Sequence, residues 1–195
     1  FNQIDGIKKS LLISKGEIIF LLDSDDFFKK NKIKKIVTKF KRNKSYEILF
    51  DKPLYYYDND NIKKNRRHYS IRNNKWPNFP PTSCISFKKK SLVNVLNKLC
   101  IKKYKELWFD FRIATYFAIK KKKFELINED LTYYRQNLFN YDKKFVKFLN
   151  IEWWNRRNQA FEFLKYLDEE SYKKNIYTID FILTKLVKKI ISLKF

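Results

Sequence analysis

The sequence contains few of the residues that make flexible or metal-rich segments. Only two Gly and four Pro occur among its 195 residues, so flexible linkers are nearly absent. A single His, His68, excludes a zinc site built from several His side chains. The two Cys, Cys84 and Cys100, have no metal-like spacing, and we expect both to be free thiols in a reducing compartment, with a disulfide between them as the alternative.

Long apolar runs are absent as well. No stretch approaches the roughly 20 apolar residues that span a bilayer, and no signal peptide is visible. The chain opens with Phe1 rather than Met, and we interpret it as a piece of a longer protein. The expected location is the cytoplasm, and attachment to a membrane surface stays open.

Acidic residues are scarce beside basic ones, which gives a formal net charge of +23. Such a charge is typical of nucleic-acid-binding proteins. However, most of the basic residues are Lys, and Asn, Ile, Phe and Tyr are also abundant, a composition that an A/T-rich coding sequence favours. We therefore expect no nucleic acid partner, although a basic nucleic-acid-binding module stays an alternative. The hydrophobic fraction of 44% is ample for one core.

The first fifty residues alternate between helical and strand-like patterns. Residues 4–12 have apolar side chains at helical spacing, and residues 17–22 form a continuous apolar run with the length of a buried strand. The core face of the next helix is predicted to contain Ile33, Ile36, Val37 and Phe40. Residues 46–50 then favour a second strand. This order is typical of strand–helix–strand units, so we expect an α/β fold with a mostly parallel sheet flanked by helices.

Beyond residue 50 the pattern predicts a long polar loop, 51–81, and then shorter elements. These are a strand at 82–87, helices at 92–99 and 111–119, and strands at 124–127 and 131–134. From residue 141 onward the apolar spacing is helical. We therefore divide the chain into an α/β domain, residues 1–140, and a helical C-terminal extension, residues 141–195.

Four carboxylates, Glu17, Asp23, Asp25 and Asp26, lie within ten residues of this otherwise basic chain. Three of them directly follow the predicted buried strand, and ligands of open α/β sheets bind outside the carboxyl ends of strands. Clustered carboxylates repel one another unless a cation intervenes, and Mg²⁺ or Mn²⁺ uses one or two carboxylates together with phosphate oxygens. The alternative is structural, with Asp26 or Asn31 capping the helix that follows.

Residues 14–28 combine a Gly-Glu turn, an apolar strand and the sequence Asp-Ser-Asp-Asp. This segment closely resembles the central segment of family 2 glycosyltransferases. Weaker similarity is present at residues 3–7, 80–88, 108–112 and 129–135, so the resemblance covers about residues 1–137. It implies the GT-A fold, a nucleotide-sugar donor and inversion at the anomeric carbon.

The resemblance also has two departures. The family's first strand and helix, which hold the nucleotide base, are expected upstream of Phe1, so we interpret the domain as N-terminally incomplete. Gln136 and Asn137 stand where the family often has a His after its Tyr-Arg pair. This weakens any metal or phosphate contact from that loop.

The resemblance implies roles for individual residues. The donor-binding residues are Asp23, Asp25, Asp26 and Arg135, and the acceptor-binding residues are Thr82, Ser83 and Trp108. Asp23 and Asp25 hold the cofactor, Mg²⁺ or Mn²⁺, which stabilises charge on the leaving diphosphate. The acceptor is a saccharide, a lipid-linked sugar or a protein.

Asp110 is the expected catalytic base for the acceptor hydroxyl. The family segment carries its acidic catalytic residue there, and the apolar neighbours Trp108, Phe109 and Phe111 raise a carboxyl pKa toward the range useful for proton transfer. The alternative is that Asp110 caps the helix that begins at Phe111. Glu106 is the second candidate for the base.

The last predicted helix has an apolar face, with Lys185, Lys188 and Lys189 on the other side. A basic amphipathic helix can lie on an anionic bilayer, so this helix is a candidate for peripheral membrane contact. Packing on the domain with a solvated Lys face is the alternative. A catalytically inactive relative that acts as a membrane-surface interaction module is a third functional hypothesis.

Overall fold

The computed structural model describes residues 3–57, 62–64, 68–71, 78–99, 102–120, 122–136, 150–168 and 177–193. The chain forms two compact units, one of Phe1–Ile101 with Phe109–Asn137 and the other of Lys102–Trp108 with Leu138–Phe195. Lys102–Trp108 therefore groups with the helical part of the chain, although the sequence placed it in the α/β domain. Cys100 and the predicted helical stretch 141–149 lie outside the described residues.

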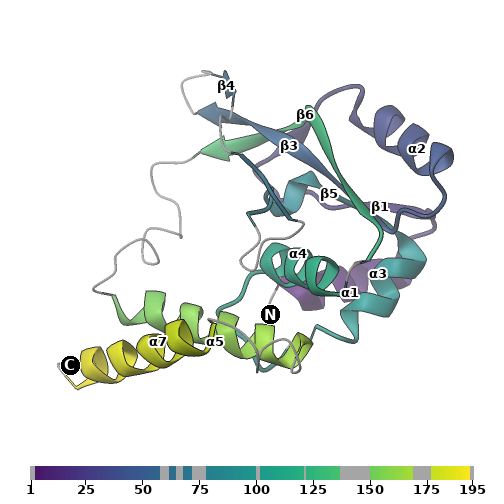
Figure 1. The fold of residues 1–195 in the computed structure, drawn as a ribbon. Coiled ribbons are helices and arrows are strands. Elements are labelled where there is room, and N and C mark those ends of the chain that lie inside the picture. The colour runs from purple at the N-terminus through teal and green to yellow at the C-terminus, as the bar shows by residue number, and fades with distance from the viewer. Residues whose placement is uncertain are drawn as a thin grey trace. The chain divides into compact units, whose positions relative to one another are not determined.

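The first unit contains a six-stranded sheet and four α-helices in its described part (Figure 1). Its elements are α1 (Gln3–Ile13), β1 (Ile18–Phe20), β2 (Phe27–Phe28), α2 (Lys32–Arg42), β3 (Ile48–Tyr57), β4 (Ile62–Lys64), the 3₁₀ turn η1 (Thr82–Cys84), β5 (Ile85–Lys88), α3 (Lys89–Leu96), α4 (Phe109–Ile119) and β6 (Phe124–Gln136). The strand order is β1-β5-β3-β6-β2, and β4 pairs with β3 at one end.

The sheet is mixed, which corrects the expectation of a mostly parallel one. β3 pairs in parallel with β6, whereas β5 is antiparallel to both β1 and β3. β1 and β3 thus run in the same direction, as a strand–helix–strand unit requires, but β5 lies between them. The order in the sequence could not reveal this insertion, because β5 comes from a distant part of the chain.

Helix α2 covers one face of the sheet (Figure 1). Ile36 and Phe40 form a buried cluster with Leu49 of β3 and with Ile127 and Leu131 of β6. The predicted core positions Ile36 and Phe40 are therefore confirmed. Ile33, which was predicted to share this face, is 55% exposed, so that prediction is wrong. Lys32 instead occupies the buried position one turn before Ile36.

Helices α3 and α4 lie on the other side of the sheet from α2 (Figure 1). The Phe87 ring of β5 lies 6.4 Å from the Phe117 ring of α4, between ring centroids. Nine of the eleven residues of α4 are buried, including Asp110 and Arg112. A helix that is apolar almost all round is expected to be surrounded by protein, which agrees with this burial.

Strand β3 extends to Tyr57, so the prediction of a loop over residues 51–81 is wrong for its first part. β6 is one strand rather than the two predicted, and its pairing with β3 shifts register on either side of Lys52. Pro53, inside the predicted loop, lies at this irregularity, where a strand tolerates proline. Long-range pairing with β6 therefore overrides the polar composition of this stretch.

The second unit contains the helices α5 (Ile151–Leu167) and α7 (Tyr177–Ser192). The two helices are joined by an ion pair of 2.6 Å between Arg157 and Asp180 and by packing of Phe161 against Phe181. Tyr104 packs on Phe163, which explains why the segment around it belongs to this unit. Among the described helices, none is both long enough and apolar enough to cross a membrane.

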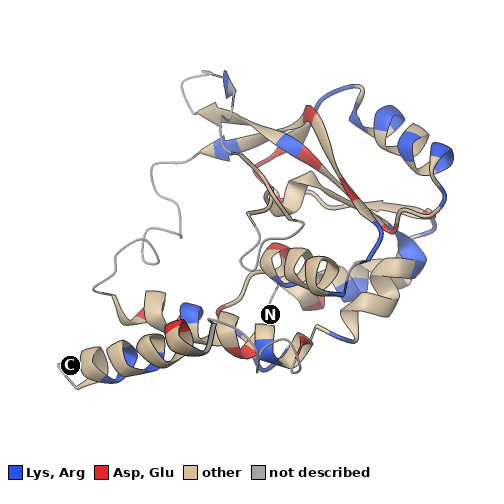
Figure 2. Ribbon diagram, viewed as in Figure 1, with Lys and Arg blue, Asp and Glu red and all other residues tan. Residues whose placement is uncertain are grey.

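Lys and Arg are spread over several elements of the chain, as Figure 2 shows for α2, the sheet and the helices of both units. The last turn of helix α2 contains Lys39, Lys41 and Arg42, which complement the helix dipole. The distribution differs from the single basic stripe that tracks a nucleic acid backbone.

Candidate active site

The acidic sequence Asp23–Asp26 forms a tight turn between β1 and β2. The Asp26 backbone N–H donates to the Asp23 carbonyl at 3.2 Å, which closes the turn. Asp25 is exposed and Asp23 is half-buried, whereas Asp26 is only 8% exposed. One turn thus presents two carboxylates to solvent and directs a third into the protein.

Asp26 connects the turn to the end of β6. Its Oδ1 accepts a hydrogen bond of 2.9 Å from the Arg135 backbone N–H. Asn31 stands at the N-cap position of α2 but makes no side-chain cap hydrogen bond there. The proposed alternative, in which Asp26 or Asn31 caps α2, is therefore not what the contacts show.

Asp23 has partners on two other elements. Its Oδ1 accepts from Gln3 Nε2 of α1 at 3.1 Å, and its backbone N–H donates to Ser83 Oγ of η1 at 2.9 Å. The turn is therefore connected to α1, η1 and β6, all of which belong to the first unit. Segments that are distant in the sequence therefore meet at the turn, and its role in donor binding stays a prediction.

The carboxylates of the turn are electrostatically strained. Burial raises the pKa of Asp23, and the Asp25 charge raises it further, although hydrogen bonds from Gln3 and Ser83 lower it. Burial, with smaller contributions from Asp25 and Asp23, raises the pKa of Asp26 to about 6 against hydrogen bonds from Ser83 and Arg135. A bound cation relieves such repulsion.

The remaining predicted site residues have varied surroundings. Asp110 is 8% exposed in the first turn of α4, and its Oδ1 accepts from the Phe111 N–H at 2.7 Å. Since α4 begins at Phe109, Asp110 lies inside the first turn and does not cap a helix that begins at Phe111, and a cap contact would reach an N–H two or three residues further on. The base role stays a prediction. Thr82 and Ser83 are buried in η1. Trp108 belongs to the second unit, where the Arg156 guanidinium lies 3.9 Å from its ring centroid.

The sequence profile of glycosyl transferase family 2 matches residues 2–126, well over half of the chain. The chain belongs to glycosyl transferase family 2. This match includes β1, the acidic turn, α2 and most of the sheet, so the turn lies within the family's region.

This family 2 domain also resembles solved structures. A crystal structure of S. aureus TarS 1–349 in complex with UDP-GlcNAc matches with a TM-score of 0.57 at 12% sequence identity, covering 90% of this chain and 50% of that chain. A second structure of S. aureus TarS 1–349 matches with a TM-score of 0.49 at 12% identity, covering 82% of this chain and 44% of that one. No curated protein sequence matches this one. The chain spans about half the length of these TarS structures. The likeness to the UDP-GlcNAc complex, with its TM-score of 0.57, confirms the GT-A-like fold.

The donor set of the turn fits a hard divalent cation. Among the described residues, no group of three or more His, Cys, Asp and Glu side chains forms a complete metal cage. Mg²⁺ seldom uses such a cage and instead takes one or two carboxylates, substrate phosphates and water. The half-buried Asp23 and the exposed Asp25, which repel each other, are the carboxylates available for this arrangement.

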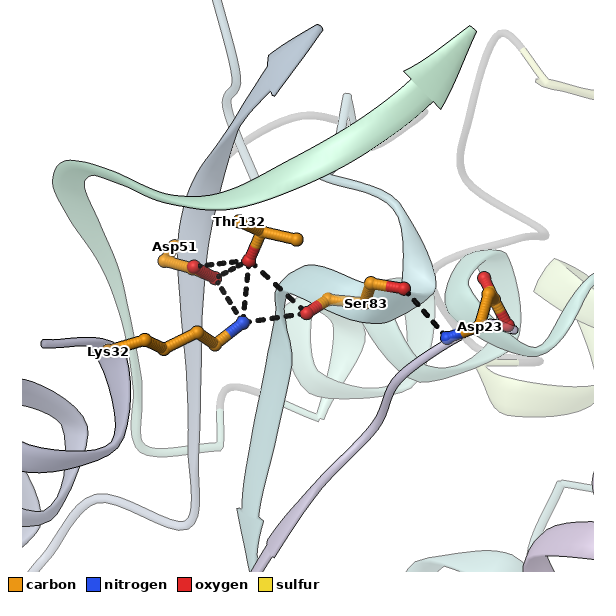
Figure 3. A network of polar contacts seen from close by, with 5 residues as sticks. All are labelled: Asp23, Lys32, Asp51, Ser83 and Thr132. Atoms are coloured by element: carbon orange, nitrogen blue, oxygen red, sulfur yellow. Dashed lines mark hydrogen bonds and ion pairs between the residues drawn. The ribbon is translucent and has the colours of Figure 1, made fainter. Parts of the chain in front are cut away.

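A buried polar network that the sequence patterns did not predict lies beside the turn (Figure 3). Lys32 and Asp51 are both 0% exposed, and Lys32 Nζ lies 3.0 Å from Asp51 Oδ1. Lys32 also donates to the Thr132 hydroxyl at 2.6 Å and to the Ser83 carbonyl at 2.7 Å. A signal was present, because Lys32 lies four and eight residues before the core positions Ile36 and Phe40.

Proposed function

We propose that this family 2 domain transfers a sugar from a nucleotide-sugar donor to a saccharide, lipid-linked or protein acceptor. The proposal includes inversion at the anomeric carbon and a requirement for Mg²⁺ or Mn²⁺. The observation that carries it is the turn after β1, where Asp25 is exposed, Asp23 is half-buried and held by Gln3 and Ser83, and neither Asp26 nor Asn31 caps α2. The UDP-GlcNAc in the similar TarS structure supports a nucleotide-sugar donor.

In this proposal Asp23 and Asp25 hold the cation together with the donor diphosphate. The cation, when bound, neutralises the charge that develops on the departing diphosphate. Gln3 and Ser83 keep Asp23 in place through its side chain and its amide. A carboxylate whose rotamer is already fixed loses less conformational entropy on binding, so these contacts favour affinity for the cation.

Arg135 is proposed to contact the donor diphosphate, with Asp26 acting through it. Asp26 fixes the Arg135 backbone, and the guanidinium carbon lies 5.5 Å from the Tyr56 ring centroid. An Arg guanidinium binds phosphate oxygens through paired N–H donors. The buried Asp26 therefore supports the donor site as a positioning residue.

Asp110 is proposed to take the proton from the acceptor hydroxyl as the new glycosidic bond forms. Its place in the almost fully buried first turn of α4, where it is 8% exposed, supports this role, because an active site that excludes bulk water keeps its proton acceptor for the substrate. The acceptor contacts predicted for Thr82, Ser83 and Trp108 remain predictions.

The test measures cation-dependent hydrolysis of a panel of nucleotide sugars, and transfer to candidate acceptors, by the full natural polypeptide. We expect Asp25→Ala to abolish the cation-dependent activity and Asp110→Asn to abolish transfer while donor binding persists. Glu129→Ala is the matched control, because Glu129 is an exposed carboxylate that pairs with Lys35 on α2. If both active-site variants keep full activity, the site assignment is wrong. The anomeric configuration of the product, followed by NMR, tests inversion.

We further propose that α7 contacts an anionic membrane surface. Ile179, Leu183, Leu186, Ile190 and Leu193 recur at helical spacing and are each more than half exposed. Phe181 and Thr184, on the side toward α5, are buried. Lys185, Lys188 and Lys189 belong to the other side of α7, where the Lys185 ammonium lies 4.3 Å from the centroid of the Phe181 ring. The exposed apolar stripe therefore carries the proposal, the lysines add positive charge to the same helix, and an anionic bilayer is the occupant that complements both.

Vesicle sedimentation tests this contact. We expect binding to vesicles containing phosphatidylglycerol, little binding to phosphatidylcholine alone, and loss of binding in a variant with Leu186→Glu and Ile190→Glu. Val93→Glu is the matched control, since Val93 is an isolated exposed apolar residue on α3. Equal binding by the double variant, or self-association of the protein that this variant abolishes, would overturn the membrane proposal.

A further inference from the structure

Lys32 is a fully buried lysine on a helix face that is otherwise apolar. Its ammonium has three N–H donors, and its three acceptors are Asp51, Ser83 and Thr132. These acceptors come from β3, η1 and β6, so one side chain connects three elements that are far apart in the sequence. The ammonium also lies 4.1 Å from the centroid of the Phe28 ring. Lys32 is therefore held in one position from several sides.

Stability does not explain this arrangement well. Desolvating two charges costs more than a typical salt bridge returns, and well-packed apolar residues in place of a buried ion pair are often neutral or stabilising. Helix α2 already has Ile36 and Phe40 as apolar anchors in the same row. A third apolar residue at position 32 would continue that row. We therefore look for the role of the charge in the groups that Lys32 contacts and keeps in place.

Ser83 is the residue through which the network reaches the acidic turn (Figure 3). Its carbonyl accepts from Lys32 at 2.7 Å, and its hydroxyl accepts from the Asp23 amide at 2.9 Å. Ser83 is itself 0% exposed, so solvent does not compete for either contact. Thr132, whose hydroxyl also lies 3.3 Å from the Ser83 carbonyl, closes the network from β6.

We propose that the buried Lys32–Asp51 pair positions the acidic turn: Asp51 and Thr132 hold Lys32, Lys32 fixes the Ser83 carbonyl, and the Ser83 hydroxyl fixes the Asp23 amide. Lys32 and Asp51 are positioning residues in this account, since neither contacts the cation or the donor. The consequence for cation binding rests on the proposed function. The positioning itself does not, because it concerns contacts within the chain.

The test separates position from stability with a double variant, Lys32→Met with Asp51→Val. This pair removes both charges together, uses apolar residues of similar volume, and leaves the Thr132 hydroxyl beside the Ser83 carbonyl. We expect its melting temperature to stay within about 5 °C of the wild type. Hydrogen exchange at the Asp23 amide is expected to become about tenfold faster, because its acceptor is no longer fixed. Affinity for Mn²⁺ with pyrophosphate, followed by the Mn²⁺ EPR signal, is expected to fall about tenfold.

Lys35→Met with Glu129→Val is the matched control. It removes another pair of a lysine of α2 and a carboxylate, but one whose side chains are both 43% exposed, so both measurements should stay at the wild-type value. Wild-type Asp23 protection and Mn²⁺ affinity in the buried double variant would overturn the proposal. If wild-type protein itself shows no Mn²⁺–pyrophosphate binding, the proposed function fails, and the Asp23 amide exchange still decides the positioning.

A second pair of substitutions covers the case in which the first double variant does not fold. Lys32→Gln with Asp51→Asn keeps hydrogen-bonding groups at both positions and removes only the charges. An increase in Asp23 amide exchange of about threefold to tenfold is expected, because a neutral donor holds the Ser83 carbonyl less tightly. Unchanged protection in this folded variant would overturn the proposal as well.

Discussion

Asp23 and Asp51 both directly follow an apolar residue, yet their surroundings are opposite. Asp51 is 0% exposed and lies 3.0 Å from the Lys32 ammonium. Asp23 is half-buried, and the charged neighbour that affects its pKa is another carboxylate, Asp25. In a chain with a net charge of +23, a cation for Asp23 would have been easy to supply. The comparison shows that the buried carboxylate has a cationic partner within the chain, whereas the charged group that affects Asp23 is a second carboxylate.

The two regions are also connected, since Ser83 contacts both of them. The buried pair is 0% exposed, whereas the turn has one exposed and one half-buried carboxylate, Asp25 and Asp23. Such an arrangement agrees with a general feature of binding sites, in which buried and well-packed groups fix the groups that meet the ligand. Predictions that change one region at a time test whether the division holds.

The largest effect is expected for Lys32→Met alone. This variant leaves Asp51 buried without its cation, so the free energy of unfolding should fall by about 3–5 kcal/mol. Burial already raises the pKa of Asp51 to about 6 while Lys32 lowers it, so the loss should be smaller at pH 5, where Asp51 can take up a proton, than at pH 8. Urea unfolding at both pH values measures this. A loss below 1 kcal/mol at pH 8 would mean that the pair is not buried as described.

The next effect concerns the turn and changes binding rather than folding. Asp25→Ala removes an exposed carboxylate that repels Asp23, so the melting temperature without ligand should stay the same or rise slightly. Mn²⁺ with UDP at about 100 times the dissociation constant should stabilise the wild type by about 2.7 kcal/mol, and this gain should be lost in the variant. Thermal unfolding with and without Mn²⁺ and UDP is the measurement. An equal gain in both proteins would remove Asp25 from the cation site.

The sequence was most informative where local pattern and tertiary contacts agree. Helix α2 was predicted from its apolar spacing, and Ile36 and Phe40 do face the sheet. The α/β class followed from the order of elements, and the family from one segment around β1. The insertion of β5 between β1 and β3 was not predictable, because strand order depends on contacts between distant residues.

The site was predictable only in part for the same reason. Asp23–Asp26 was found because its residues are adjacent in the sequence. Ser83 and Arg135 were predicted as site residues from the resemblance alone. The contacts of Gln3, Ser83 and Arg135 with the turn were not predicted, because they join residues 20 to 109 positions apart. Lys32 was overlooked because a lysine near a helix start is usually solvated. Its burial depends on Asp51, whose own position is set where the pairing of β3 and β6 shifts register.

Asp26 should give a moderate, pH-dependent effect on stability. Its folded pKa of about 6 lies above the usual 3.8, so the folded state binds the proton more tightly than the unfolded state. Stability from this group is therefore full below about pH 4 and is lost as the pH rises through 6. Asp26→Asn should remove that loss. The difference in unfolding free energy between the variant and the wild type should therefore change by about 1–2 kcal/mol between pH 4 and 7, a range that allows for solvent screening near the turn. Chemical unfolding across this range measures it, and parallel curves for the two proteins would contradict it.

The smallest effect is expected for Lys35→Met, which lies one helical turn from Lys32. Lys35 pairs with Glu129, and both side chains are 43% exposed, so water and salt screen the pair. We expect a change in unfolding free energy of about 0.2–1 kcal/mol that disappears in 0.5 M NaCl, measured by urea unfolding at low and high salt. Lys32→Met and Lys35→Met both replace a lysine of α2 by methionine and remove the same charge. The difference between their losses in unfolding free energy therefore measures the effect of burial. A loss above 2 kcal/mol for Lys35→Met would show that the pairs differ less in solvation than their exposure indicates.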